Sequence, residues 1–568
     1  MNIIKNNQVI FILFFVIGFS YQFDTEKIVT IISLLIICLL ILFKNFQYSN
    51  SEFGLQFIHN IGRIPKILIS FFSLFVITLI TQNVYLNYET ITWDVASYLV
   101  ASIEISEGYI PMETQWESKG PLLFYIYNYL FDISNSNYVI FRLLNDVVLY
   151  LISLVLFSIV YILSDKKILK SFMISVLFIL LTSKVSYVSE FSELYCLFFI
   201  ALAYLFNLII QKNILKYFIV GFLISLSSSV NQGSLLFLIP FIVMIILDNK
   251  KNYKNFLIQV SALFFAFTLF HAFFIIIYFS KDMADLYFAN YVKIPLGYTG
   301  ESLSSFYELR VWAREFYHYN RFLYFSFFTL IIVFTLDNLK SIKSSILDIN
   351  VISIIIGILI YFIGSHNYYH HLFYFLFFLP LLFTKVSDKR YEKLIFSFIF
   401  FATINIFINS IQPAYNNLKS IDTTLQNYPL YQLSEEIDSY FEGEYSVFAL
   451  DYLFVLSYLD IKNYSYIVHP MNHFEEFITS VLIDIGRIEE DNVNFLINSE
   501  PDVIICNTTM IINGEILRID KINNYNCEIL EYKGNYFRLD TDKYRKNNNL
   551  FYYKDPYRTI NVYLKKSK

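Results

Sequence analysis

Charged residues are scarce in this chain. Asp, Glu, Lys and Arg make up only 16% of the 568 residues, whereas 56% are hydrophobic and 20% are aromatic. The mean hydropathy is +0.52. A soluble globular protein of this length does not have such a composition, so the sequence indicates a membrane protein. The four cysteines are also too few for a disulfide framework.

Two nucleotide-handling motifs are missing or out of place. The chain has no G-x-x-x-x-G-K-[ST] phosphate loop, so nothing indicates direct ATP hydrolysis. Its one Asp-x-Asp triplet, at residues 540–542, lies in a hydrophilic stretch near the end, far from a strand end that would suggest a nucleotide-sugar site. Chance is the better explanation of that triplet. The sequence therefore indicates neither direct ATP hydrolysis nor a nucleotide-sugar site.

Long apolar runs fill most of the chain. Each run is close to the ~20 residues that a helix needs to cross a bilayer. We therefore expect a polytopic α-helical membrane domain over residues 1–411, followed by a water-exposed domain of ordinary composition over residues 412–568. The sequence predicts about thirteen spans, at residues 8–20, 28–44, 66–82, 139–163, 168–183, 191–210, 214–230, 234–247, 256–279, 321–336, 351–364, 370–385 and 393–411.

Lysine and arginine alternate between the predicted loops. Every second loop holds a basic group, such as Lys166, Lys167 and Lys170, whereas the short loops between them hold only Lys27 and Lys184. Basic residues in short loops stay in the cytoplasm. The alternation therefore predicts a cytoplasmic N-terminus, and it places the loops at 83–138 and 280–320 and the C-terminal domain together on the outside.

The external loop 83–138 is unusually polar for its position. We expect Asp94 to open a helix, "VASYLVASIEISE", that Gly108 stops in a C-cap position. The helix has one apolar stripe, as expected of a helix on the membrane surface, and Asp94 and Tyr98 fall on one face. In "WESKGPLLFYIYNYL", Lys119 precedes a Gly-Pro break that starts a second, aromatic-rich interfacial helix.

Both charged residues also have structural interpretations. Aspartate before a helix is a common N-cap, which satisfies free backbone N–H groups. A lysine beside an apolar helix often extends its ammonium to the headgroup level of the membrane. Neither interpretation explains why Asp94 and Lys119 share one external loop between two helices that are expected to lie flat.

These motifs, taken in order, resemble a known family. The Asp after an early span, "G-Y-I-P" and "W-E-S-K-G-P-L-L-F-Y" look like the first external loop of the GT-C glycosyltransferases, closest in pattern to the bacterial protein O-mannosyltransferase and lipid A aminoarabinose transferase group. "YVSEFSELYCLFF", "SHNYYHHLFYFLFFLP" and "EPDVIICN" resemble later motifs of that family. The chain departs from it in having three predicted spans before the acidic loop and Ser118 directly before the lysine.

The resemblance implies an enzyme of the bacterial plasma membrane that takes a sugar from a polyprenyl-phosphate donor. The sugar would pass, with inversion, to a hydroxyl of a lipid, glycan or protein acceptor at the outer face. Asp94 is the candidate base for the acceptor hydroxyl. Lys119, helped by Arg314 or Arg310, is the candidate cation for the leaving phosphate. A lipid-linked donor fits the missing nucleotide-sugar motif, and we expect no nucleic-acid partner.

Further candidates for the site lie near predicted outside helix ends. Glu190 and Glu193 are three residues apart and would share a helix face, where Glu193 could hold the acceptor or order Asp94; acidic residues at a solvated helix start are the alternative. His370 and His371 are predicted to bind sugar or phosphate by hydrogen bonding, although interfacial packing is the favoured alternative. Histidines four residues apart, such as His366 and His370, could also ligate a metal, but no acidic partner lies nearby in the sequence to support that interpretation. A divalent metal is possible but its ligands are unknown, and His271 is best interpreted as a packing histidine.

The C-terminal domain has an α/β pattern. "YSVFAL", "YSYIVHP" and "DVIICN" predict buried strands, residues 451–460 and 473–498 predict helices, and "CEILEYKGNYFRL" and "NVYLKK" predict antiparallel strands. Cys506 and Cys527 could form a disulfide if this domain lies outside the cytoplasm. We assign the domain to acceptor recognition or to covering the active site.

Two other functions remain open. A transporter or flippase of lipid-linked saccharides should show two related halves and paired charges near the midplane. The predicted spans are nearly free of charge and show no clear repeat. A polysaccharide polymerase or ligase needs large external loops with basic catalytic residues, whereas the first large external loop here begins with an acid.

Overall fold

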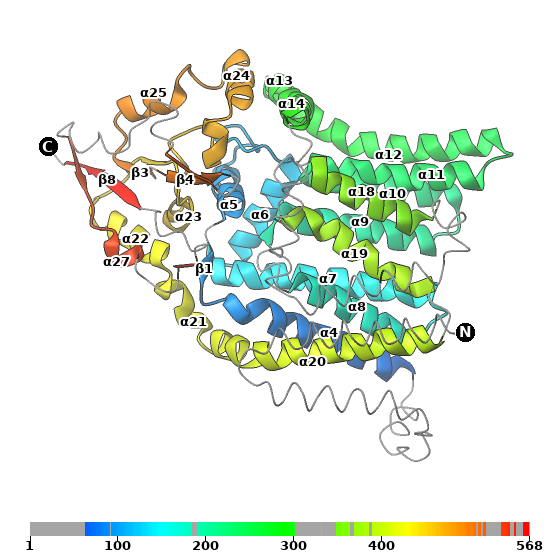
Figure 1. The fold of residues 1–568 in the computed structure, drawn as a ribbon. Helices are drawn as coiled ribbons and strands as arrows, with labels where there is room; N and C mark the ends of the chain where they lie inside the picture. The colour runs from blue at the N-terminus through cyan, green and yellow to red at the C-terminus, as the bar shows by residue number, and fades with distance from the viewer. Residues whose placement is uncertain are drawn as a thin grey trace.

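The computed structural model describes residues 63–90, 92–183, 190–301, 331, 348–363, 369–385, 389–506, 509–512, 515–518, 535–545, 550–551 and 560–566. The predicted spans at 8–20 and 28–44 lie outside these residues, and that at 321–336 is described only at residue 331. Within them, the protein is mostly helical, with long apolar helices side by side and a small mixed sheet near the C-terminus at one end of these helices (Figure 1).

Six helical stretches of the described chain are long and apolar enough to cross a membrane: Arg63–Tyr85, Tyr138–Leu163, Ser192–Ile209, Asn213–Val230, Tyr253–Ser280 and Ile395–Lys419. They indicate an integral membrane protein. The corresponding helices are α4 (Arg63–Gln82), α7 (Tyr138–Leu163), α9 (Ser192–Ile209), α10 (Asn213–Val230), α12 (Tyr253–Ser280) and α20 (Lys389–Lys419). Shorter apolar helices pack among them, namely α8 (Ile168–Thr182), α11 (Leu238–Asp248), α18 (Ile349–Ile363) and α19 (Phe373–Leu381).

Helix α20 continues to Lys419, past residue 411, where the apolar run ends and the sequence predicts the domain boundary. Its polar last turns pack on the 3-10 turn η1 (Asn83–Tyr85), which directly follows α4. The Nδ2 group of Asn417 donates to the carbonyl oxygens of Asn83 and Val84, both at 2.9 Å. Hydropathy locates the membrane-crossing part of a helix and not its end.

The basic ends of several helices lie together, away from the C-terminal domain (Figure 1). Near the starts of α8 and α20, the ammonium of Lys170 lies 3.9 Å from the Glu392 carboxylate. The ammonium of Lys385 forms an ion pair with Asp348 at the same end. The alternation of basic loops predicts that these basic residues lie at the same end of the helices. The assignment of that end to the cytoplasm stays a prediction.

Helix α5 (Trp93–Ser106) follows α4 after a short loop. Its N-cap is Thr92, and Asp94 lies inside the first turn, so the interpretation of Asp94 as the N-cap is wrong. The expected stop at Gly108 is confirmed: Gly108 has φ +90°, its N–H donates to Ile105 O, and the Tyr109 N–H donates to Glu104 O. These bonds form a Schellman motif, which requires the positive φ that glycine adopts without strain.

The surface position expected for α5 is also wrong. Every residue from Val95 to Glu104 is buried, because α5 packs against α6 (Pro121–Ile133) on one side and α23 (Phe454–Leu459) of the C-terminal domain on another. A single apolar stripe underestimates the burial of a helix covered by a second domain. Helix α6 does keep exposed apolar residues at Tyr129 and Ile133, which is consistent with an interfacial helix.

The C-terminal sheet has the strand order β2-β3-β8-β6. Strands β2 (Val447–Ala449) and β3 (Val503–Cys506) are parallel, whereas β8 (Asn561–Lys565) pairs antiparallel with both β3 and β6 (Tyr536–Arg538). Helices α22 (Pro429–Asp438), α23, α24 (Glu476–Asp484) and α25 (Asn492–Asn498) accompany it. The strands predicted from "YSVFAL", "DVIICN" and "NVYLKK" are confirmed. Cys506 is disulfide-bonded.

The predicted strand "YSYIVHP" is wrong, because its partner lies outside the sheet. Ile467 forms an isolated parallel bridge with Trp116 of the loop region 83–138. The Trp116 N–H donates to Tyr466 O at 2.6 Å, and the Val468 N–H donates to Trp116 O at 3.1 Å. This pairing joins the C-terminal domain to the loop region 83–138 near Lys119.

Candidate functional site

Asp94 meets a histidine of the C-terminal domain. The Oδ1 atom of Asp94 lies 3.6 Å from Nε2 of His469, and the two side chains are 29% and 13% exposed. One helical turn after Asp94, the Tyr98 hydroxyl lies 3.4 Å from the same carboxylate oxygen. Tyr98 is fully buried. The carboxylate is thus held from two sides and remains partly open to solvent.

The charges around Asp94 favour its ionised form. Burial alone would raise the pKa of Asp94, but contact with His469 and the positive charges near the carboxylate, including Lys119, outweigh burial and hold the pKa well below its usual range. Burial would lower the pKa of His469, but Asp94 and Glu117 outweigh it and raise that pKa. The pair therefore favours a carboxylate beside an imidazolium.

Lys119 contacts the same tyrosine from the segment between α5 and α6. Its Nζ atom lies 5.8 Å from the centre of the Tyr98 ring. The described part of the chain places no carboxylate within salt-bridge distance of this ammonium. Its backbone is held firmly, because Asn290 Nδ2 donates to Lys119 O at 2.8 Å. A partly buried ammonium in this state can accept an anionic ligand.

Gly120 helps to determine the backbone position of Lys119. Its N–H donates to Val230 O at 3.0 Å, so the start of α6 lies directly on the end of α10. A Cβ atom at this position would lie 2.1 Å from Ser229 O and 2.7 Å from the Tyr291 hydroxyl. Only glycine permits this approach, which explains the Gly after Lys119 in the "ESKGP" motif.

Glu117 is a neighbour of the site that the sequence reasoning missed. It is 2% exposed. Asn472 Nδ2 of the C-terminal domain lies 3.5 Å from its Oε2 atom. Burial is the main cause that raises the pKa of Glu117, although His469 and Lys119 act in the opposite direction. The signal was present in the sequence, because Glu117 stands two residues before Lys119 in the quoted motif.

His469 was missed as well, because its segment was interpreted as a buried strand. The indole Nε1 of Trp93 donates to Asp451 Oδ1 at 2.8 Å, which ties the start of α5 to the C-terminal domain. The Trp93 ring then packs edge-on against the His469 ring, with centroids 6.2 Å apart. Only the docking of the two domains brings this histidine to Asp94. The sequence around His469 shows no more than a histidine before a proline, which does not identify a site residue.

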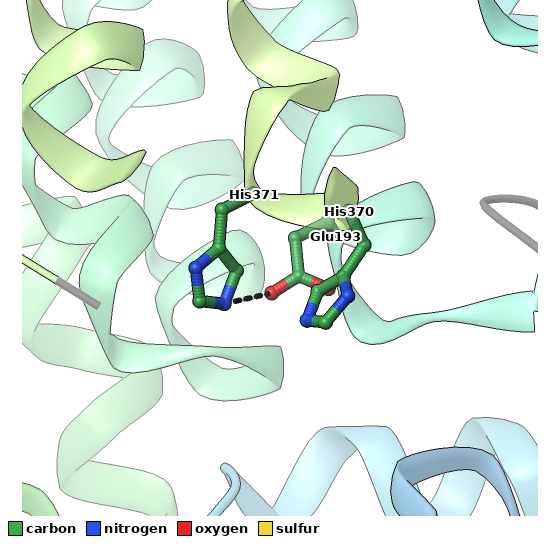
Figure 2. A group of neighbouring side chains, drawn as sticks. All are labelled: Glu193, His370 and His371. Atoms are coloured by element: carbon green, nitrogen blue, oxygen red, sulfur yellow. Dashed lines mark ion pairs between the residues drawn. The ribbon is translucent and has the colours of Figure 1, made fainter. Parts of the chain in front are cut away.

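A second group combines three of the predicted residues. Glu193, in the first turn of α9, meets His370 and His371 of the 3-10 turn η5 (Tyr369–Leu372) (Figure 2). Their ligand-type atoms all lie within 4.8 Å of one another. His371 Nε2 is 3.7 Å from Glu193 Oε1. The His370 ring stacks on Phe191, with centroids 4.1 Å apart and planes 7° apart.

The charges of both groups act on Tyr98. Burial is the main cause that raises the pKa of Tyr98 well above its usual value, and the carboxylates of Asp94 and Glu193 add to that effect. One buried phenol thus senses both carboxylates, as well as the Lys119 ammonium over its ring. We treat Asp94, Lys119, Glu117, His469 and the histidine pair with Glu193 as one site. Tyr98 supports the site, and its own contact with substrate stays a prediction.

Glu190 is engaged elsewhere. Because α9 begins at Ser192, Glu190 precedes the helix, and the shared helical face expected for Glu190 and Glu193 does not form. The Arg142 Nε atom donates to Glu190 Oε1 at 2.7 Å, both side chains are buried, and the Tyr138 hydroxyl donates to the other oxygen. This buried ion pair joins the start of α7 to the start of α9. The predicted role of Glu190 in substrate binding stays untested.

Three further residues were singled out from the sequence. Arg314 and Arg310 lie outside the described residues. His271 has both ring nitrogens within hydrogen-bond distance of a hydroxyl: Nε2 is 2.7 Å from Ser228 Oγ and Nδ1 is 3.0 Å from the Tyr287 hydroxyl. This is the satisfied packing histidine that the sequence favours.

No model of a known protein family matches the chain, and no curated protein matches it either.

Proposed function

We propose that this protein is a membrane glycosyltransferase that moves a sugar from a polyprenyl-phosphate donor to an acceptor hydroxyl, with inversion. One observation carries the proposal: the Asp94 carboxylate lies 3.4 Å from the Tyr98 hydroxyl, and the Lys119 ammonium lies 5.8 Å from the centre of the same ring, without a direct ion pair between the two charged groups. They lie at the end of a bundle of apolar helices. A base and an anion-binding cation are the two charges that this transfer needs.

The proposed reaction is a single displacement. The acceptor oxygen forms a bond to the anomeric carbon while the bond from that carbon to the donor phosphate oxygen breaks. The phosphate keeps the electron pair of the broken bond, and Lys119 stabilises the added negative charge as a point charge. Asp94 orients the acceptor hydroxyl and receives its proton. A carboxylate with a lowered pKa is a weak base, which suits a late proton transfer, after most of the positive charge has developed on the sugar.

His469 is proposed as a positioning residue. It holds the Asp94 carboxylate in one orientation and keeps it ionised at neutral pH, because an imidazolium neighbour stabilises the charged form. The C-terminal domain therefore completes the site in addition to covering it. Acceptor recognition by this domain remains part of the proposal.

The outer face of the plasma membrane is the proposed location of the site. Disulfides persist in oxidising compartments and are rare in the cytoplasm, so the disulfide-bonded Cys506 supports an extracytoplasmic C-terminal domain. Nucleotide sugars are not expected there, which favours a lipid-linked donor. The alternation of basic loops supports the same orientation, with a cytoplasmic N-terminus.

The test is sugar transfer in membranes that carry the wild type, Asp94→Asn or Lys119→Ala, supplied with radiolabelled polyprenyl-phosphate sugars. We expect each variant to lose transfer by about 10²–10⁴-fold, the usual contribution of a well-placed acid–base group or charge stabiliser. Asp132→Asn and Lys212→Ala, which change exposed residues, are the matched controls and should retain activity. Full activity in Asp94→Asn, at equal expression, would refute the mechanism.

A further inference from the structure

We propose that Glu193, His370 and His371 form a site for a divalent transition metal, with Zn²⁺ the best fit. Among the residues that the structure describes, this is the group of histidine, cysteine and acidic side chains whose three ligand atoms come together within 4.8 Å. The carboxylate of Glu193 lies between the two imidazole rings (Figure 2). The three residues come from α9 and η5, which are far apart in sequence.

The spacing is close to that of a metal site. Zn²⁺ binds nitrogen and carboxylate oxygen at about 2.0–2.2 Å, so two ligands of a tetrahedral ion lie roughly 3.4 Å apart. His371 Nε2 and Glu193 Oε1 are already 3.7 Å apart. The widest separation in the group is at most 4.8 Å, so a small rotation of one imidazole would bring all three ligands into range.

The donor set selects among metals. Two imidazoles and one carboxylate are ligands typical of Zn²⁺ with an open fourth position, and they also suit Co²⁺ and Mn²⁺. Ca²⁺ and Mg²⁺ prefer shells of oxygen ligands, which this group does not supply.

Neighbouring side chains already orient the ligands. Asn231 Nδ2 donates to Glu193 Oε1 at 3.0 Å, and Ser192 Oγ donates to Glu193 Oε2 at 3.1 Å. The stacking of His370 on Phe191 fixes the plane of that imidazole. Such partners are the usual outer shell of a metal site, because they hold ligand orientation before the ion arrives. Glu193 and His370 are also buried, which lowers the cost of excluding water from a bound ion.

The role of the ion rests on the proposed function. The open coordination position would take a phosphate oxygen of the lipid donor, so that the metal and Lys119 share the charge that develops on the leaving group. The segment after α10 contacts both parts of the site: Asn231 Nδ2 donates to Glu193 Oε1 at 3.0 Å, and the next residue, Gln232, donates through Nε2 to the carbonyl oxygen of Ser118, which precedes Lys119, at 3.4 Å. A cation at Glu193 therefore lies close enough to serve the same substrate.

The test measures metal binding without transfer. The full chain in detergent is stripped with a chelator, dialysed, and titrated with Co²⁺, whose visible absorption reports tetrahedral coordination; bound Zn²⁺ is then counted by mass spectrometry. We expect one equivalent in the wild type, with loss of about 10–100-fold in affinity in Glu193→Gln, His370→Gln and His371→Gln. His271→Gln, outside the group, is the matched control and should bind as the wild type does. Thermal melting of the stripped variants identifies any that fail to fold.

Absence of binding in the wild type, or equal binding in well-folded Glu193→Gln and His371→Gln, would overturn the site. A transfer assay on the same samples separates the two proposals. Metal that binds through these residues to a chain without transfer activity would retain the site and refute glycosyl transfer. Full transfer by the stripped wild type would refute the assigned role of the metal and leave Asp94 and Lys119 as the active groups.

Discussion

Replacing His469 by Gln tests whether the C-terminal domain sets the charge of the proposed base. In the structure, His469 Nε2 lies 3.6 Å from Asp94 Oδ1. Coulomb's law at that separation gives about 1 kcal/mol in water and about 5 kcal/mol at an effective dielectric constant of 20. Because Asp94 is partly open to solvent, with 29% of its side chain exposed, we expect the interaction energy of the His469–Asp94 pair to lie nearer the lower figure.

The direction follows from the pKa of Asp94. This pKa is held low against burial by His469 and the nearby positive charges, so removing the imidazolium must raise it. The protonated, inactive form of Asp94 then persists to higher pH, and the acid limb of the pH–rate profile for transfer moves upward. Gln retains a hydrogen-bond donor, so the orientation of the carboxylate is largely preserved and the effect of charge is isolated.

The assay is kcat/KM for sugar transfer measured across pH in detergent or proteoliposomes. His473→Gln is the matched control, because this buried histidine lies in the same turn, η8 (Pro470–His473), and burial lowers its pKa to about 3, so it carries no charge near neutral pH. We expect its profile to keep the wild-type limb. A reduced rate in His469→Gln with an unmoved acid limb would refute the electrostatic role and leave His469 as a packing contact between domains.

Two predictions concern stability. Gly120→Ala should cost roughly 1–3 kcal/mol, because its Cβ would meet Ser229 O at 2.1 Å, whereas Gly233→Ala, whose nearest neighbour is at 3.5 Å, should be nearly neutral in thermal unfolding. Burial raises the pKa of Glu89 to about 8 and of Glu104 to about 7, so the folded state binds more protons than the unfolded state between pH 4.5 and these values. The free energy of unfolding should therefore fall as pH rises through this range. Substituting both residues by Gln should make the free energy of unfolding less dependent on pH. An unchanged slope of that free energy against pH in the double variant would contradict this prediction.

The six long apolar helices were predictable because their signal is local. A run of apolar residues long enough to cross a bilayer must form a helix in lipid, where every backbone group has to be satisfied within the segment. The predicted run at 139–163 and helix α7 differ by a single residue at the start. The stop at Gly108 was predictable for the same reason, because the left-handed conformation after a helix is a property of the glycine itself.

The burial of α5 was not predictable in the same way. Its apolar stripe is compatible with a membrane surface, and only the docking of α23 shows that the opposite face is covered too. The strand predicted for "YSYIVHP" was wrong for a related reason. It has the composition of a strand, but it pairs with Trp116 in the loop region 83–138, and the identity of a partner cannot be read from one strand.

The sequence by itself determined the long apolar helices that indicate a membrane protein, the polar character of the residues around Asp94 and Lys119, and the helix stop at Gly108, since these depend on composition and on neighbouring residues. The tertiary structure decided which of these residues meet. His469, Glu117 and the grouping of Glu193 with His370 and His371 all depend on contacts between segments far apart in the chain. Such contacts arise from packing that buries apolar surface across two domains, and no local pattern records which distant side chains that packing will bring together.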